Sequence, residues 1–419
     1  DVILAVAQGE EEPVDVTDMR LRDAVALIRG KKGTEVRLTL RRLGLKPFIV
    51  PIVRDVVVIE ESFVKSAMVV EPESGKHYGY VKIPSFYRDF ETTRNGGNGR
   101  NSTDDVTAAL ETFNQNEMAG LILDLRNNGG GALTDAVGIA GLFLGAGPVV
   151  QVRNGDGDAK ILQSYNKKVA YRGPLVVLVN QFSASASEIV AGALQDYGRA
   201  MIVGSEHTHG KGTVQVIMDL DKSLTLRNMR EYMPLGALKM TTQKFYRVSG
   251  DSTQYRGVIP DIVLPDRSRY SEYGERYLDY SLPWDRIEAV EHSHWPSVDY
   301  ADLNAKSQAR VAKNKDFIEI QRVAEAMGER IKNTRQSLLI ADVVNERDDL
   351  QGMSLNRHGA TDDMDEEADD ELKKPVDEEL SATEKLIKSV LEDAYAKESM
   401  AILDDLAAQQ AAVASKKTD

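Results

Sequence analysis

The sequence predicts a mixed α/β protein (α+β) with a layered core, followed by a helical region. Between residues 119 and 204, short apolar runs of strand length alternate with segments that have helical spacing. This alternation is typical of cores in which helices cover a sheet. After about residue 265 the strand-like runs stop and helical patterns take over.

Composition excludes several classes of protein. The chain has 419 residues, which suggests about two to four domains. No apolar run approaches the roughly 20 residues that span a bilayer. A net charge of -14 argues against nucleic acid as a partner. The absence of cysteine excludes disulfides and thiol catalysis, and it fits a cytosolic and a periplasmic protein equally.

Residues 1–44 are expected to form a small module of strand, helix and strand. Asp1–Ala7 reads as a strand, and Thr17 or Asp18 caps a helix that Gly30 ends. An alternating strand follows at Gly33–Arg41. The chain opens without an initiator Met or a signal peptide, so we expect it to be the inside of a longer polypeptide whose targeting segment is missing.

A glycine turn follows the first buried strand of the layered core. Leu121–Leu125 is apolar, Gly129–Gly131 is a run of three glycines, and Thr134–Leu144 has helical spacing. A strand at Pro148–Arg153 is expected to complete a β-α-β unit. A phosphate-binding loop is discounted, because no Gly-Lys-Ser/Thr follows the glycines.

A serine-rich turn follows the second buried strand, Leu175–Val179. The helical pattern of Glu188–Asp196 begins directly after it, so the chain turns sharply from strand to helix. Ser185 therefore lies near the positive end of a helix dipole, beside free backbone N–H groups of the kind that an oxyanion needs. The residues alone leave a second interpretation open, in which this run is only a helix cap formed by Ser187 or Glu188.

A serine nucleophile needs a base, and no Gly-x-Ser-x-Gly elbow is present. The nearest basic groups lie in Gly204–Gln215. A lysine acts as a base only if burial lowers its pKa from about 10.4 to about 7–8. Glycines flank Lys211 and allow it to fold inward, and Thr208 and Gln215 are positioned to bond a neutral amine. A plain surface turn at Gly-Lys-Gly is the alternative.

Three segments, Phe182–Ile189, Gln195–Ala200 and Gly210–Gln215, resemble the catalytic segments of the carboxyl-terminal processing (tail-specific) serine proteases of the long periplasmic type. These are Ser-Lys peptidases with a Clp protease/crotonase-like fold. The resemblance implies a catalytic set, two supporting acids and a set of oxyanion N–H donors. The catalytic set is the nucleophile Ser185, the base Lys211 and the orienting residues Thr208 and Gln215; the supporting acids are Glu188 and Asp196; and the donors are Gly130 or Gly131 together with Ala186.

The lysine loop departs from the family pattern. The family usually reads Gly-Glu-Pro-Thr-aromatic-Gly-Lys, whereas this loop is one residue longer and has His207 and His209 at the proline and aromatic positions. A rival hypothesis therefore makes one of these histidines the base in a Ser-His-acid arrangement. The favoured interpretation places both in a loop near the substrate groove.

The resemblance extends to the domain organisation. Residues 1–44 resemble the later half of a PDZ domain, whose carboxylate-binding loop normally lies upstream. We expect a protease core at 45–265, a helical region at 266–352, an acidic linker at 353–380, and a helix with its tail at 381–419 that Ser381 and Glu384 open as a capping box. The helical parts resemble the C-terminal domain of the long family members.

The resemblance implies a periplasmic endopeptidase of a Gram-negative bacterium. It would act on proteins or peptides with exposed, apolar, unstructured carboxyl termini, need no metal or other cofactor, and work with or without an adaptor protein. Two alternatives stay open. One is a crotonase-type acyl-CoA enzyme, which would need neither Ser185 nor Lys211, and the other is a catalytically silent peptide-binding scaffold.

Overall fold

The computed structural model describes residues 1–42, 46–55, 60–94, 96–223, 233, 235–335, 337–343 and 380–415. These form two compact units, Asp1–Glu61 and Ser62–Asp419. Both contain helices and strands, which confirms the mixed α/β prediction. The predicted acidic linker lies outside the described residues except at Leu380.

The first unit is an antiparallel sheet with one helix. Its strands have the order β2-β1-β3-β4 and enclose a small core of Val6, Val16, Val36 and Leu38. The elements are β1 (Val2–Gln8), β2 (Val14–Asp15), α1 (Leu21–Ile28), β3 (Glu35–Arg41) and β4 (Phe48–Val53). The unit extends past the expected boundary at residue 44, because β4 pairs with β3 along its whole length.

The second unit is built around a six-stranded sheet in the order β14-β11-β10-β7-β6-β5. All neighbours are parallel except β5, which is antiparallel to β6. The strands are β5 (Lys65–Val70), β6 (His77–Lys82), β7 (Gly120–Asp124), β10 (Leu175–Val179), β11 (Met201–Gly204) and β14 (Ile262–Val263).

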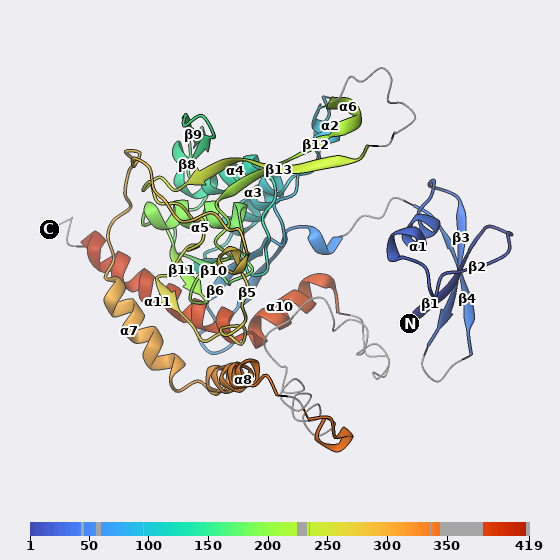
Figure 1. Cartoon of the computed structure of the whole chain (residues 1–419). Helices are drawn as coiled ribbons and strands as arrows, with labels where there is room; N and C mark the ends of the chain where they lie inside the picture. Colours follow the sequence, from blue (N-terminus) through green and yellow to red (C-terminus); the bar gives the residue numbers. More distant parts are fainter. Residues whose placement is uncertain are drawn as a thin grey trace. The chain divides into compact units, whose positions relative to one another are not determined.

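Helices cover both faces of this sheet. Leu121 and Leu123 of β7 point into one core, against α3 (Ser102–Phe113), α4 (Leu133–Leu144) and α5 (Ala186–Asp196). Ile122 between them points into the opposite core, against helices from the end of the chain. Figure 1 shows α11 crossing this second face of the sheet. The strands are therefore buried on both sides, which accounts for their continuous apolar runs.

The strand after α4 does not join the parallel sheet. β8 (Gly147–Asn154) belongs to a separate antiparallel sheet in the order β12-β13-β8-β9, with β9 (Ala159–Ser164), β12 (Thr213–Asp219) and β13 (Ala237–Tyr246). The expected β-α-β unit is therefore wrong at its last strand. The reason is that β9 follows β8 directly and folds back on it, so β8 pairs with β9 on one side and with β13 on the other.

The chain ends in helices that pack on the core. They are α7 (Tyr300–Val311), α8 (Lys315–Lys332), α10 (Ala382–Glu392) and α11 (Ala394–Ser415). The Ser381–Glu384 capping box is confirmed at the start of α10. The shorter elements are α2 (Phe90–Arg94), α6 (Leu220–Ser223) and the 3-10 turns Glu60–Ser62 and Glu275–Tyr277. Across the described part of the chain, no helix has the length and apolarity needed to cross a membrane.

Candidate active site

Three turns meet at the carboxyl edge of the parallel sheet, where α/β folds place their sites. They follow β7, β10 and β11, which are neighbours in the sheet. The first turn holds the glycines 129–131, the second holds Ser185, and the third holds Lys211. The sheet thus gathers three segments that are far apart in the sequence.

Ser185 occupies a strained position directly before α5. Its backbone φ is 55° and ψ is -108°, outside the regions that residues other than glycine usually adopt. Its N–H donates to Glu188 Oε2 at 2.8 Å. Such strain persists only where the surroundings enforce it, and it is common at active sites. The side chain of Ser185 is therefore presented at the amino end of a helix.

Glu188 connects the serine turn to the lysine loop. Its side chain is fully buried, and its two oxygens accept four hydrogen bonds. Oε2 accepts from the N–H groups of Ser185 and Lys211, and Oε1 accepts from the Thr208 hydroxyl and the Gly210 N–H. Burial raises the pKa of Glu188 to about 7, although the four donors oppose this rise. One carboxylate oxygen therefore lies between the backbones of Ser185 and Lys211.

The Lys211 loop depends on glycine on both sides. Gly210 has φ of +89°, and at Gly212 an added Cβ would lie 2.6 Å from the backbone nitrogen of Gln254. The half-buried Lys211 places its Nζ 3.4 Å from Gln215 Oε1, a hydrogen bond at the long end of the range. The loop and the start of β12 thus bring the expected partner Gln215 to the amine.

Thr208 lies elsewhere than expected. Its hydroxyl donates to Glu188 at 2.6 Å and accepts the N–H of Val258 at 2.8 Å, and the residue is fully buried. Among the described hydrogen bonds, this hydroxyl thus contacts Glu188 and not the lysine amine. Gly257 leaves room for Thr208, since a Cβ there would lie 2.6 Å from the Thr208 carbonyl oxygen.

The glycine turn lies directly beside Ser185. At Gly130 (φ +105°) an added Cβ would lie 2.9 Å from the Ser185 Cβ and 3.1 Å from the Ala186 nitrogen. At Gly131 (φ +143°) it would lie 2.2 Å from the Phe86 carbonyl oxygen. The N–H of Gly130 donates to Asn128 Oδ1 at 2.8 Å. Close packing and positive φ therefore require glycine at both positions.

The two histidines of the lysine loop are half-buried. Burial lowers the pKa of both His207 and His209. His207 Nδ1 lies 2.7 Å from the Thr208 carbonyl oxygen, and the His209 ring packs edge-on against Tyr273 at 5.3 Å between centroids. The described contacts of the two rings are thus with the loop backbone and an aromatic ring, whereas the His209 backbone N–H donates to the Ser183 carbonyl oxygen of the serine turn at 3.0 Å.

Asp196 lies at the far end of α5 from Ser185. It forms an ion pair with Arg247, which follows β13, and Ser249 N–H donates to it. Ten helical residues lie between it and the serine, which is about 16 Å along the axis. Asp196 therefore anchors α5 to the chain after β13.

Two residues that the sequence did not single out support these turns. Asn128 is fully buried, and its carbonyl oxygen accepts from Ala184 N–H and from the Ser187 hydroxyl. Gln254, also fully buried, accepts the Gly212 N–H beside Lys211 at 2.9 Å. The Asn-Asn pair directly before the glycines could have indicated a turn that side chains support. The sequence around Gln254 contains no pattern that indicates its role.

Comparison with known proteins identifies the class to which this site belongs. Residues 77–264 match peptidase family S41, and residues 268–408 match the C-terminal domain of tail specific protease (DUF3340). Residues 77–264, which hold the three turns, thus belong to peptidase family S41. Within that family, its C-terminal helices are those of the tail-specific type.

Individual relatives agree with this assignment. The chain is 40% identical to the tail-specific protease of Haemophilus influenzae over 368 residues, which is 85% of this chain and 47% of that protein. It is 34% identical to the carboxy-terminal-processing protease of Bartonella bacilliformis, over 62% of this chain and 54% of that protein. The chain thus spans about half the length of these relatives. Among solved structures, the photosystem II D1 C-terminal processing protease matches with 26% identity, 62% of each chain and a TM-score of 0.39.

Proposed function

We propose that the chain is a serine endopeptidase that uses a Ser-Lys dyad and acts on polypeptides with unstructured, apolar carboxyl termini. The observation that carries this proposal is that Glu188 accepts hydrogen bonds from both segments that carry the reacting side chains. The strained Ser185 and the Lys211 backbone donate to the same buried oxygen. Family membership supports the reaction class.

In the proposed reaction, Ser185 Oγ forms a bond to the carbonyl carbon of the scissile peptide. The neutral Lys211 amine accepts the proton that Oγ gives up. The carbon–nitrogen bond then breaks, and the leaving amine takes that proton from Lys211. Water then attacks the ester carbon while Lys211 accepts its proton. The bond between this carbon and Ser185 Oγ breaks, Oγ takes the proton back from Lys211, and the carboxyl product leaves.

The oxyanion of the tetrahedral intermediate requires N–H donors beside Ser185. We assign one donor to Ala186, since the N–H groups of a first helical turn have no partner within the helix. Of the two glycine candidates we favour Gly131, because the N–H of Gly130 already donates to Asn128. Gly130 then serves as the close contact between the two turns.

The other expected residues take supporting roles in this proposal. Gln215 orients the lysine amine, and Glu188 with Thr208 fixes the loop that carries Lys211. Asp196 holds the far end of the helix that begins after Ser185. His207 and His209 line the loop without accepting the serine proton.

We also propose the finer features that the resemblance implies. They are a Clp protease/crotonase-like core, a first unit that acts as part of a PDZ domain, and a periplasmic location. A PDZ-type unit captures a carboxyl-terminal peptide as an added strand. Protein substrates with exposed carboxyl termini, delivered with or without an adaptor protein, are the proposed partners.

A peptide-cleavage assay tests this function. An unstructured peptide that ends in apolar residues is incubated with the wild type and with Ser185→Ala, Lys211→Ala, His207→Ala and His209→Ala. We expect both dyad variants to lose cleavage and both histidine variants to keep it. If a histidine variant is inactive while Lys211→Ala cleaves, the base is that histidine.

Two further readouts separate the remaining alternatives. Turnover of an acyl-CoA thioester that persists in both dyad variants would indicate a crotonase-type enzyme, and peptide binding without any turnover would indicate a scaffold.

A further inference from the structure

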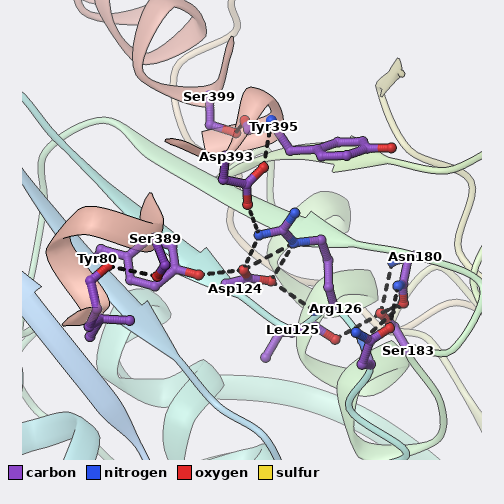
Figure 2. Close-up of polar contacts among 12 residues, drawn as sticks. Tyr80, Asp124, Leu125, Arg126, Asn180, Ser183, Ser389, Asp393, Tyr395 and Ser399 are labelled. Carbon is purple, nitrogen blue, oxygen red and sulfur yellow. Dashed lines mark hydrogen bonds and ion pairs between the residues drawn. The ribbon is translucent and has the colours of Figure 1, made fainter. Parts of the chain in front are cut away.

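A buried ionic cluster lies at the carboxyl end of β7, just before the glycine turn (Figure 2). Asp124, the last residue of the strand, accepts from the Arg126 guanidinium through both oxygens and from the Tyr80 hydroxyl at 2.6 Å. Burial alone would raise the pKa of Asp124, but Arg126 keeps it below its ordinary value. The pair is therefore ionised inside the protein.

The second partner of Arg126 comes from the C-terminal helices. Its Nη2 donates to Asp393 Oδ2 at 2.6 Å, and Asp393 Oδ1 accepts the Tyr395 N–H at 2.8 Å. Asp393 stands in the short break between α10 and α11. The side chains of Arg126 and Asp393 are only 17% and 15% exposed, so solvent screens this ion pair far less than a surface pair.

The residues on either side of Arg126 are bonded to the serine turn. Leu125 carbonyl oxygen accepts from the Ser183 hydroxyl at 2.8 Å. Asn127 N–H donates to Asn180 Oδ1 at 3.0 Å, and Asn180 Nδ2 donates back to Asn127 Oδ1 at 2.6 Å. Figure 2 shows Leu125, Asn180 and Ser183 next to the ionic cluster. Arg126 therefore lies within the segment that holds the two turns together.

We infer that Asp393 is a positioning residue for the reaction, which fixes Arg126 and through it the alignment of the glycine turn with the Ser185 turn. The turn contains Asn127 at φ 61°, a conformation that residues other than glycine keep only when their surroundings enforce it. The C-terminal helical region then contributes to catalysis by positioning the two turns and not only to stability. This inference rests on the proposed function.

Asp404 offers a matched control within the same helical region. It lies on α11 and accepts from Lys76 Nζ at 2.7 Å and from the Tyr78 hydroxyl at 2.9 Å. Tyr78 pairs with Gly120 at the beginning of β7, whereas the active site lies beyond the strand's other end. Asp404→Ala thus removes a contact between the same helical region and the same sheet, but away from the turns.

The experiment measures kcat and KM for peptide cleavage by the full chain with Asp393→Ala, Asp393→Asn or Asp404→Ala. We expect Asp393→Ala to lower kcat by about 10- to 100-fold with little change in KM, because small displacements of reacting groups have effects of this size. Asp404→Ala should keep the wild-type kcat. Equal kcat values for the two alanine variants would overturn the inference.

Asp393→Asn separates the ion pair from the helix cap. Asparagine keeps an acceptor for the Tyr395 N–H but removes the charge opposite Arg126. A low kcat in Asp393→Asn supports positioning through Arg126, whereas full recovery would assign the effect to the cap alone and overturn the inference.

Hydrogen exchange distinguishes failure of this inference from failure of the proposed function. If the wild type cleaves no peptide, the proposed function fails. The inference is then judged by amide exchange at Asn127 and Ala184, which should be faster in Asp393→Ala and unchanged in Asp404→Ala. Unchanged exchange in both variants would overturn it independently of activity.

Discussion

Replacing Glu188 with glutamine tests the shared carboxylate at the centre of the site. The substitution keeps the size of the side chain but replaces one acceptor oxygen with an amide NH₂. Each oxygen of Glu188 accepts two hydrogen bonds, so either orientation of the amide turns a donor toward other donors. If the NH₂ faces Thr208, the hydroxyl can reverse and accept, but the Gly210 N–H loses its partner.

The structure sets the size of the effect. A buried donor without a partner costs about 1–3 kcal/mol. The free energy of unfolding of the wild type also depends on pH, because burial raises the pKa of Glu188 from 4.5 to about 7. A shift of this size corresponds to about 3 kcal/mol. Because the pKa of Glu188 is higher in the folded state, its protonated carboxyl group stabilises the fold fully below pH 4.5. This stabilisation is lost as the pH rises through 7.

The assay is urea unfolding of the wild type and Glu188→Gln at pH 5 and pH 8. At pH 5 we expect the variant to be less stable by about 1–3 kcal/mol. The wild type should lose about 3 kcal/mol of stability toward pH 8, because only the wild type has the titrating group, so the difference should vanish or change sign. Glu206→Gln is the control, since Glu206 lies in the Lys211 loop in an exposed ion pair with Arg269, which contributes about 0–1 kcal/mol. A difference for Glu188→Gln that stays constant with pH would refute the reasoning.

Three further variants probe the supports of the site. Gly131→Ala should lower kcat for peptide cleavage on the order of 100-fold, since its Cβ would lie 2.2 Å from the Phe86 carbonyl oxygen. Gly129→Ala is the control and should keep wild-type cleavage, because a Cβ there meets nothing within 4 Å. Gln254→Leu should lower the free energy of unfolding by about 1–3 kcal/mol in urea, because the Gly212 N–H loses its acceptor; equal stability would contradict this. Asp196→Asn should lower the melting temperature but leave kcat unchanged, and a large loss of kcat would show that Asp196 has a closer role.

The sequence predicted the parts of the site that are continuous along the chain. The strand, turn and helix around Ser185 follow from an apolar run and helical spacing, and the glycine turn follows from three consecutive glycines. It could not assign β8 to its sheet, because periodicity shows that a strand forms but not which strand it pairs with.

Contacts between distant residues account for most of what the sequence did not reveal. Glu188 reads locally as an ordinary acid in the first turn of a helix, and only the fold brings Thr208 and Lys211 to it. Arg126 and Asp393 are 267 residues apart in sequence, and neither belongs to a motif. Such pairings depend on how the helices pack over the sheet, which no local pattern encodes.

The central claim is that the Lys211 amine activates the Ser185 hydroxyl. The most direct measurement is the rate at which a fluorophosphonate, which phosphonylates activated serines, labels the wild type, Ser185→Ala and Lys211→Met, with the modified residue located by mass spectrometry. The account predicts labelling of Ser185 in the wild type and none above background in either variant. Labelling of Ser185 in Lys211→Met at the wild-type rate would contradict it.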